Sequence, residues 1–213
     1  MEKYTKPNFN RCAVITIDTQ NDFSLPGAVA EIKGTYAVIP RMKLILDAAR
    51  ASGIPIIHVV RLYMENGSNV DLCRKELIES GVAIVRPGTK GAELVEEIMP
   101  ADAKAADPRV LLEGSLPLIG PSEWMMYKPR WGAFYQTGLE AFLRDKDIDT
   151  LIFIGCNFPN CPRTSIYQAS ERDFKLILVE DSLSGVYEQG ITEMKNIGVR
   201  IYQTQPLLNE LQQ

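Results

Sequence analysis

The stretch that decides the fold runs from residue 150 to residue 164. It reads TLIFIG over residues 150–155, then CNFPN, then CPRT from Cys161 onward. A continuous run of β-branched and aromatic residues predicts a strand buried on both faces of a parallel sheet. Pro162 favours the first turn of a helix, where a missing N–H costs nothing. The stretch therefore predicts a buried strand, a short turn and a helix that opens at Cys161, with Cys161 as its cap.

Outward from this stretch, short apolar runs alternate with amphipathic segments, as in chains built from βαβ units. The predicted strands cover residues 12–18, 54–60, 123–128, 150–155, 175–180 and 199–203. The predicted helices cover residues 38–52, 92–99, 139–146 and 191–197, together with one that opens at Cys161 and one that begins at Leu207. Residues 61–87 are expected to form a loop or cap, and residues 101–121 a surface excursion. Right-handed crossovers then give an α/β fold with a six-stranded parallel sheet, for which we expect the doubly wound order 3-2-1-4-5-6.

Composition limits the class of protein. With 213 residues and 46% hydrophobic content, residues 1–213 are expected to form a single domain. The net charge of −4 comes from 27 acidic and 23 basic residues without a basic run, so no nucleic-acid partner is expected. No apolar run approaches the roughly 20 residues that span a bilayer, so we expect no membrane contact and a cytoplasmic protein. The lone histidine, His58, is interpreted as a packed core residue, and neither a metal nor a cofactor is expected.

Three chemically active side chains fall at the carboxyl ends of predicted strands. Asp18 closes the first strand, Lys128 closes the third, and Cys161 follows the fourth after a short turn. Ligands of parallel sheets bind outside these ends, where neighbouring connections diverge. In the expected strand order, Asp18 and Cys161 flank this crevice, whereas the strand of Lys128 lies two places away, about 9 to 10 Å. We therefore expect the lysine side chain to reach across the top of the sheet.

The three groups suit a nucleophilic reaction. The amides and dipole at the start of the Cys161 helix favour the thiolate, which is the form that attacks carbon. Asp18 is expected to take the thiol proton and return it to a leaving amine, while Lys128 holds the carboxylate and the thiolate together. The backbone N–H groups of Asn157 and Cys161 are expected to form an oxyanion hole.

Each of these residues also has a simpler interpretation. Asp18 fits a turn-forming aspartate, and Lys128 fits a solvated charge at a strand end. Trp131 and Phe134 fit either core aromatics or the wall of a pocket. The remaining cysteines are interpreted as small core residues, namely Cys12, Cys73 and Cys156.

Three segments together resemble one family. They are Ile17-Asp18-Thr19-Gln20-Asn21-Asp22-Phe23, Lys128-Pro129-Arg130-Trp131-Gly132-Ala133-Phe134, and Gly155 to Cys161 leading into Thr164 and Arg172-Asp173-Phe174. Their order on alternating strands resembles the isochorismatase-like cysteine hydrolases, which include nicotinamidases, N-carbamoylsarcosine amidohydrolase, biuret hydrolase and ureidoacrylate amidohydrolase. The resemblance implies a three-layer α/β/α sandwich, an Asp18, Lys128 and Cys161 catalytic triad, and a cis peptide bond before the nucleophile, at Asn157-Phe158.

The sequence departs from the family pattern at two places. The nicotinamidase metal motif, an aspartate and several histidines after the second strand, is absent, which disfavours nicotinamidase activity. The usual Gly-Val-x-Thr-Asp-x-Cys turn carries Phe158 and Pro159 in place of its small polar pair. The residues expected to contact substrate are Gln20, Phe23, Arg130, Trp131, Phe134 and Phe158. Arg61, Arg130 and Arg163 fit either a clamp for a substrate carboxylate or a solvated surface.

The leading hypothesis is a cysteine hydrolase that cleaves a C–N bond of a small amide, ureido or N-carbamoyl substrate through a covalent acyl-enzyme. One alternative is a vinyl-ether hydrolase of the isochorismatase type, in which Asp18 acts as an acid without a covalent step. Another is a non-catalytic family member that binds small molecules in the same pocket. The resemblance also leads us to expect a homo-oligomer, either a dimer or a tetramer.

Overall fold

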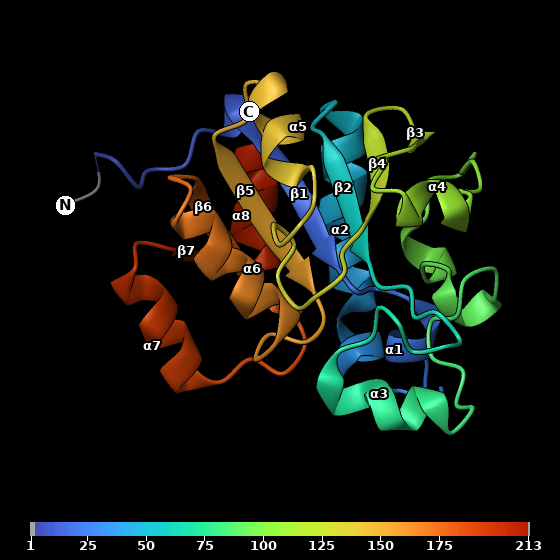
Figure 1. The fold of residues 1–213 in the computed structure, drawn as a ribbon. Coiled ribbons are helices and arrows are strands. Elements are labelled where there is room, and N and C mark those ends of the chain that lie inside the picture. The colour runs from blue at the N-terminus through green and yellow to red at the C-terminus, as the bar shows by residue number, and fades with distance from the viewer. Residues whose placement is uncertain (1–2, 213) are drawn as a thin grey trace.

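A seven-stranded sheet with helices on both faces forms the centre of the computed structural model, which describes residues 3–212 (Figure 1). The strands are β1 Cys12–Ile17, β2 Ile56–Val60, β3 Leu118–Gly120, β4 Glu123–Tyr127, β5 Thr150–Gly155, β6 Lys175–Leu183 and β7 Arg200–Tyr202. The α-helices are α1 Asn21–Ser24, α2 Thr35–Ala51, α3 Leu72–Glu79, α4 Pro108–Leu112, α5 Leu139–Asp145, α6 Cys161–Ser170, α7 Glu188–Asn196 and α8 Thr204–Leu211. Three 3₁₀ turns complete the chain: η1 Phe9–Arg11, η2 Lys90–Ala92 and η3 Glu96–Ile98.

The strand order is β3-β4-β2-β1-β5-β6-β7. The six predicted strands lie in the predicted order, and every pair among them is parallel. The prediction of a six-stranded, purely parallel sheet is nevertheless wrong, because β3 adds an antiparallel edge strand beside β4. That strand has three residues between Pro117 and Pro121, which is too short for hydrophobic periodicity to reveal it.

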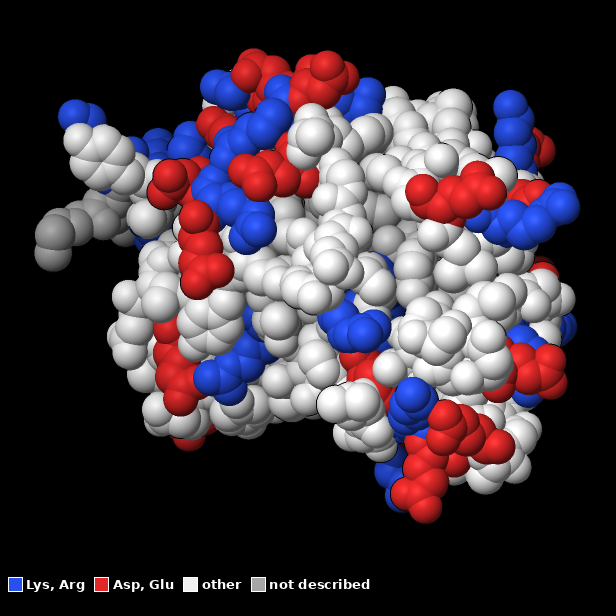
Figure 2. Space-filling model, in the orientation of Figure 1, with Lys and Arg blue, Asp and Glu red and all other residues white. Residues whose placement is uncertain are grey.

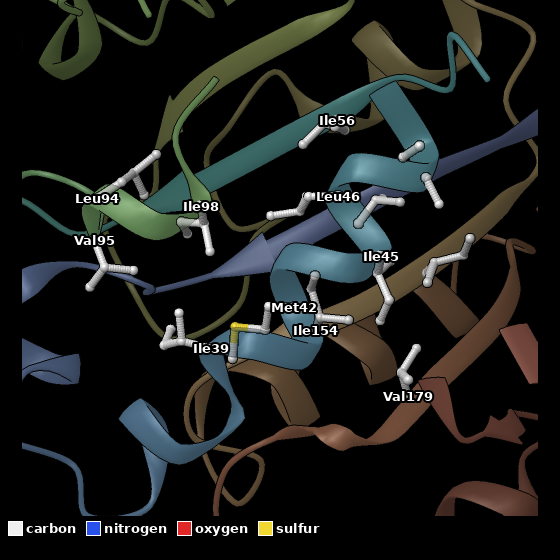
Figure 3. Packing of buried hydrophobic residues seen from close by; sticks show 14 of the residues in the cluster. Ile39, Met42, Ile45, Leu46, Ile56, Leu94, Val95, Ile98, Ile154 and Val179 are labelled. Atoms are coloured by element: carbon white, nitrogen blue, oxygen red, sulfur yellow. The ribbon is translucent and has the colours of Figure 1, made fainter. Parts of the chain in front are cut away.

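The central strands alternate their side chains between two apolar layers. On one face, Ile45 of α2 packs in a cluster with Ile56 of β2 and Ile154 of β5 (Figure 3). The other face buries Ile15 and Phe153 beneath α5, α6 and α7. This arrangement is a three-layer α/β/α sandwich, with the continuous apolar strands in the middle as expected for a sheet covered on both faces.

A cap lies beyond the carboxyl ends of the strands and includes α1 and α3 (Figure 1). Its own apolar cluster contains Phe23, Tyr63 and Ile78. The predicted helix over residues 92–99 is wrong: η2 and η3 form there instead, because Leu94 between them is extended and bridges to Gln20. The cap and the sheet edge together border the site described below.

Two further expectations are wrong. Residues 101–121 are more than a surface excursion, since they form α4 and β3 and bury Leu111 and Ile119 in the core. Cys73 is exposed on α3, not packed in the core, because that helix buries only Ile78. The interpretation of His58 is confirmed: it is fully buried between Thr16 and Glu123, with ring nitrogens 2.8 and 2.6 Å from their oxygens.

Charged side chains of both signs are interspersed on the face shown in Figure 2. No basic stripe that could follow a phosphate backbone is visible on that face. Within residues 3–212, no helix is long and apolar enough to cross a membrane.

Candidate active site

Strand β2 anchors the backbone of both Asp18 and Lys128. It lies between β1 and β4, and its last residues accept one hydrogen bond from each side. The Asp18 N–H donates to the Val59 carbonyl at 2.9 Å, and the Lys128 N–H donates to the Val60 carbonyl at 3.0 Å. The two residues are thus fixed at the same edge of the sheet, although 110 positions separate them in the chain.

The two side chains meet above β2 as a buried ion pair. Lys128 Nζ lies 3.0 Å from Asp18 Oδ2, and the side chains are 0% and 5% exposed. The lysine therefore does span the two-strand separation. Its ammonium also donates to the Arg130 carbonyl at 3.3 Å. Among residues 3–212, Asp18 Oδ1 has no hydrogen-bond partner, so one carboxylate oxygen is held by the lysine and the other is free to accept a proton.

Gly155 brings the end of β5 against the end of β1. Its φ is +126°, and a Cβ on it would lie 2.4 Å from the Ile17 carbonyl oxygen, so only glycine fits there. The next residue, Cys156, continues this contact by donating its N–H to the same oxygen at 2.9 Å. This close approach carries the following turn, and with it Cys161, toward Asp18.

The turn before Cys161 contains a cis peptide bond at Cys156-Asn157. The expected position, Asn157-Phe158, is wrong by one residue, because the chain leaves the sheet directly after the last pairing of Cys156. Helix α6 begins at Cys161 with Asn160 as its N-cap, so the expectation that Cys161 itself is the cap is also displaced by one residue. Within the described chain, neither the Asn157 nor the Cys161 N–H donates to a protein acceptor.

Burial of Cys161 works against the expected thiolate. Burial raises the pKa of the Cys161 thiol to about 12, and the Asp18 carboxylate adds to the rise, while the Lys128 ammonium opposes it. The thiol is only 6% exposed, and desolvation of the charged form is the largest cause of the rise in its pKa. Below that pH the sulfur keeps its proton, and a nucleophilic attack needs a base to remove it.

A small cavity of about 10 Å³ brings several of the sequence-predicted residues together. This is room for about one water molecule. Its lining includes these predicted residues: Asp18, Phe23, Arg61, Trp131, Asn157 and Cys161. Lys128 reaches the group through its ion pair with Asp18.

Other residues expected to contact substrate lie elsewhere. Gln20 donates both amide hydrogens to the carbonyls of Arg61 and Ala92, at 2.7 and 2.8 Å, and thereby joins the cap to β2. Phe134 and Phe158 are buried in the layer of α5 to α7. They are absent from the cavity wall, because the turns that carry them direct the rings inward to the core.

The two remaining arginines also point away from the cavity. Arg130 is exposed and donates to the Asn69 carbonyl at 3.1 Å. Arg163 pairs with Glu193 and donates to Tyr187. Neither lines the cavity, so of the three arginines considered from the sequence only Arg61 does.

The sequence did not point to five other residues of the cavity wall: Ile32, Tyr63, Arg74, Cys156 and Asn160. Arg74 comes from α3, which has no motif and no strong apolar periodicity. Cys156 was interpreted as a core residue, and although it is buried, its thiol donates to the Asp18 carbonyl at 3.0 Å. The position of Asn160, directly before the predicted nucleophile, was the one available signal.

A larger cavity of about 300 Å³ lies elsewhere, against Leu62, Leu94, Met99 and Leu111. It contains none of the three strand-end residues and is lined mainly by apolar side chains. Its apolar lining would suit an apolar ligand, but Asp18 and Cys161 line the small cavity instead.

The residues after β2 do not suit a divalent metal. Arg61, Leu62 and Tyr63 stand where the family resemblance places the nicotinamidase metal motif. A guanidinium has no lone pair to offer a cation, and the nearby carboxylate of Asp71 is paired with Arg61. Across residues 3–212, no group of three or more His, Cys, Asp or Glu side chains is arranged to hold a metal ion.

The fold and this site define a three-layer α/β/α protein with a thiol, a carboxylate and an ammonium at the carboxyl edge of a doubly wound sheet. Residues 12–111 and 112–205 match the model of the isochorismatase domain. The chain therefore belongs to the isochorismatase family and to its cysteine hydrolase superfamily, which confirms the resemblance seen in the sequence.

Three relatives illustrate the match. A protein of Arabidopsis thaliana described as a probable inactive nicotinamidase is 31% identical over 88% of this chain and 90% of its own length. The N-carbamoylsarcosine amidase of an Arthrobacter species is 30% identical over 88% of this chain, which spans 66% of that enzyme. The crystal structure of an isochorismatase family protein from Desulfovibrio vulgaris superposes with a TM-score of 0.81 at 31% identity, covering 95% of this chain and 99% of that one.

Proposed function

We propose that this hydrolase cleaves a C–N bond of a small amide, ureido or N-carbamoyl molecule through an acyl-enzyme on Cys161. The observation that carries the proposal is the buried Asp18–Lys128 pair beside the Cys161 thiol, with one carboxylate oxygen left free. The relative named as an N-carbamoylsarcosine amidase supports the same reaction class. Since the metal motif is missing, the proposal uses only side chains and backbone of this chain.

In the first step the Cys161 sulfur attacks the substrate carbonyl carbon while Asp18 Oδ1 takes the thiol proton. Because burial raises the pKa of this thiol to about 12, proton removal has to accompany attack. A positioned base of this kind contributes about 10²- to 10⁴-fold to the rate. Lys128 holds the carboxylate in place and, as a neighbouring cation, stabilises the negative charge that develops on sulfur.

The carbonyl oxygen becomes an oxyanion as the C–S bond forms. The free N–H groups of Asn157 and Cys161 are suited to bind it, and removing one such donor typically costs about 10²- to 10³-fold. Collapse of the intermediate breaks the C–N bond, and Asp18 returns its proton to the leaving nitrogen. A water molecule, deprotonated by Asp18, then attacks the thioester and releases the acid and the Cys161 thiol.

Ammonia release from a panel of carboxamides, ureides and N-carbamoyl amino acids tests the proposal. Cys161→Ser and Asp18→Asn should each lower the rate on the best substrate about 10⁴-fold or more, because losing one member of a catalytic unit removes most of the rate enhancement of the whole unit. Cys73→Ser is the matched control, because this thiol is exposed and outside the cavity, and it should retain full activity.

Undiminished turnover by Cys161→Ser would refute the covalent mechanism. Hydrolysis of isochorismate that survives loss of Cys161 but not of Asp18 would favour a vinyl-ether hydrolase. The lack of turnover on every compound would favour a binding protein.

A further inference from the structure

Arg61, which lines the cavity, has an unused hydrogen-bond donor. Its side chain is only 2% exposed. The terminal nitrogens are engaged: one binds Asp71 and donates to the Tyr63 hydroxyl at 3.2 Å, and the other lies 3.4 Å from the Lys128 carbonyl. Within residues 3–212, the Nε–H has no hydrogen-bond partner, although the residue lines the cavity. A buried donor left unpaired costs about 1–3 kcal/mol and indicates a missing acceptor.

Arg74 adds a second cation to the cavity wall. It lies on α3, and its guanidinium carbon is 5.4 Å from the Phe23 ring centre and 5.5 Å from that of Trp131. It also donates to the Tyr63 hydroxyl at 3.2 Å. Among the residues described, no carboxylate forms an ion pair with Arg74, so its charge is stabilised by ring faces and the Tyr63 hydroxyl without a counter-ion.

The charges around the cavity are therefore unequal. Lys128 pairs with Asp18 and Arg61 pairs with Asp71, which leaves Arg74 as one uncompensated positive charge. The rings of Phe23, Tyr63 and Trp131 lie around its guanidinium, and the low dielectric beside them strengthens its attraction for an anion. Arg74 is also the least buried of the charged residues that line the cavity. A cavity of about 10 Å³ has to widen to admit any substrate.

We propose that Arg74 and the Arg61 Nε–H together bind a carboxylate of the substrate, so that the enzyme acts on small amido or ureido acids in preference to their neutral analogues. This inference rests on the proposed function, because it names the substrate class of the same site. Arg74 determines specificity: it binds the part of the substrate that does not react. Charge-assisted hydrogen bonds of guanidinium groups to carboxylates are stronger than neutral ones and select for this group.

The test compares N-carbamoylglycine with its methyl ester, which differs by the negative charge. Binding to the Cys161→Ala protein is measured by calorimetry, so that the result does not depend on turnover. Arg74→Gln in this background should weaken binding of the acid by between about tenfold and hundredfold and leave binding of the ester unchanged. The matched control is Lys75→Gln on the same helix, whose ammonium faces Glu79 and not the cavity.

Several results would overturn the inference. Equal losses of binding affinity for the acid and the ester would show that Arg74 acts through packing. A protein that does not bind the acid, or that binds it no better than the ester, would exclude an anion site. Arg74→Lys keeps the charge and should retain most of the preference, which guards against a folding defect in the glutamine variant. If the acid binds as expected but the unmodified protein releases no ammonia from any compound, the anion site stands and the proposed hydrolysis fails.

Discussion

Replacing Lys128 with methionine removes the cation from the buried pair while keeping a side chain of similar length. The Asp18 carboxylate is then left in a site where it is 5% exposed, without the ammonium that lies 3.0 Å from Oδ2. Breaking a buried pair by removing one partner typically costs about 3–5 kcal/mol, because the other charge stays desolvated. We expect Lys128→Met to lower the free energy of unfolding by about this amount.

The matched control is Lys43→Met, which breaks an ion pair with Asp47 on the surface of α2. Those side chains are 50% and 45% exposed, so this loss should be no more than about 0.5 kcal/mol. Urea unfolding followed by tryptophan fluorescence measures both. The double variant Asp18→Asn with Lys128→Met should recover part of the loss, since both charges are gone. Equal, small losses for Lys128→Met and Lys43→Met would refute the view that Lys128 and Asp18 form a buried, mutually dependent pair.

Three further outcomes are expected from the turn and its thiol. Gly155→Ala should destabilise the protein by at least about 2 kcal/mol in thermal unfolding, because its Cβ would lie 2.4 Å from a backbone oxygen. Gly138→Ala is the control: its Cβ would meet only Leu116 at 3.8 Å, so the change should be nearly neutral. Iodoacetamide at pH 8 should label the exposed Cys73 well before Cys161, whose pKa is raised to about 12, and faster labelling of Cys161 would contradict this. Burial raises the pKa of Cys161 from 9.0 to about 12, so the folded state binds this proton more tightly than the unfolded state does. The contribution of this proton to the free energy of unfolding is therefore complete below pH 9 and is lost between pH 9 and 12, at up to about 1.4 kcal/mol per pH unit. Cys161→Ala should reduce that slope in alkaline denaturation.

The central sheet could be predicted from sequence because its signals are local. Residues 150–155 form β5 with the predicted bounds, because a short unbroken apolar run in an α/β chain is typical of a strand buried on both faces. Strand β3 could not be predicted in this way. Its pairing depends on β4 lying alongside, and three residues between two prolines give no periodic signal.

Part of the candidate site could also be predicted from the sequence, because the carboxyl ends of parallel strands meet at one edge of the sheet. The proximity of Asp18 and Lys128 is an example. The ionisation of Cys161 could not be inferred, since it depends on burial in the folded protein, which no helix-dipole argument includes. Arg74 was also beyond sequence reasoning, because its role depends on three aromatic rings from other segments.

The central claim is that Cys161 forms a covalent bond to the substrate carbonyl carbon. Mass spectrometry of protein quenched in acid during turnover of its best substrate tests this most directly. We predict an adduct with the mass of the acyl or carbamoyl group on the peptide that contains Cys161, and none in the Cys161→Ala protein. Full turnover with an unmodified Cys161, or an adduct on a different residue, would contradict the account.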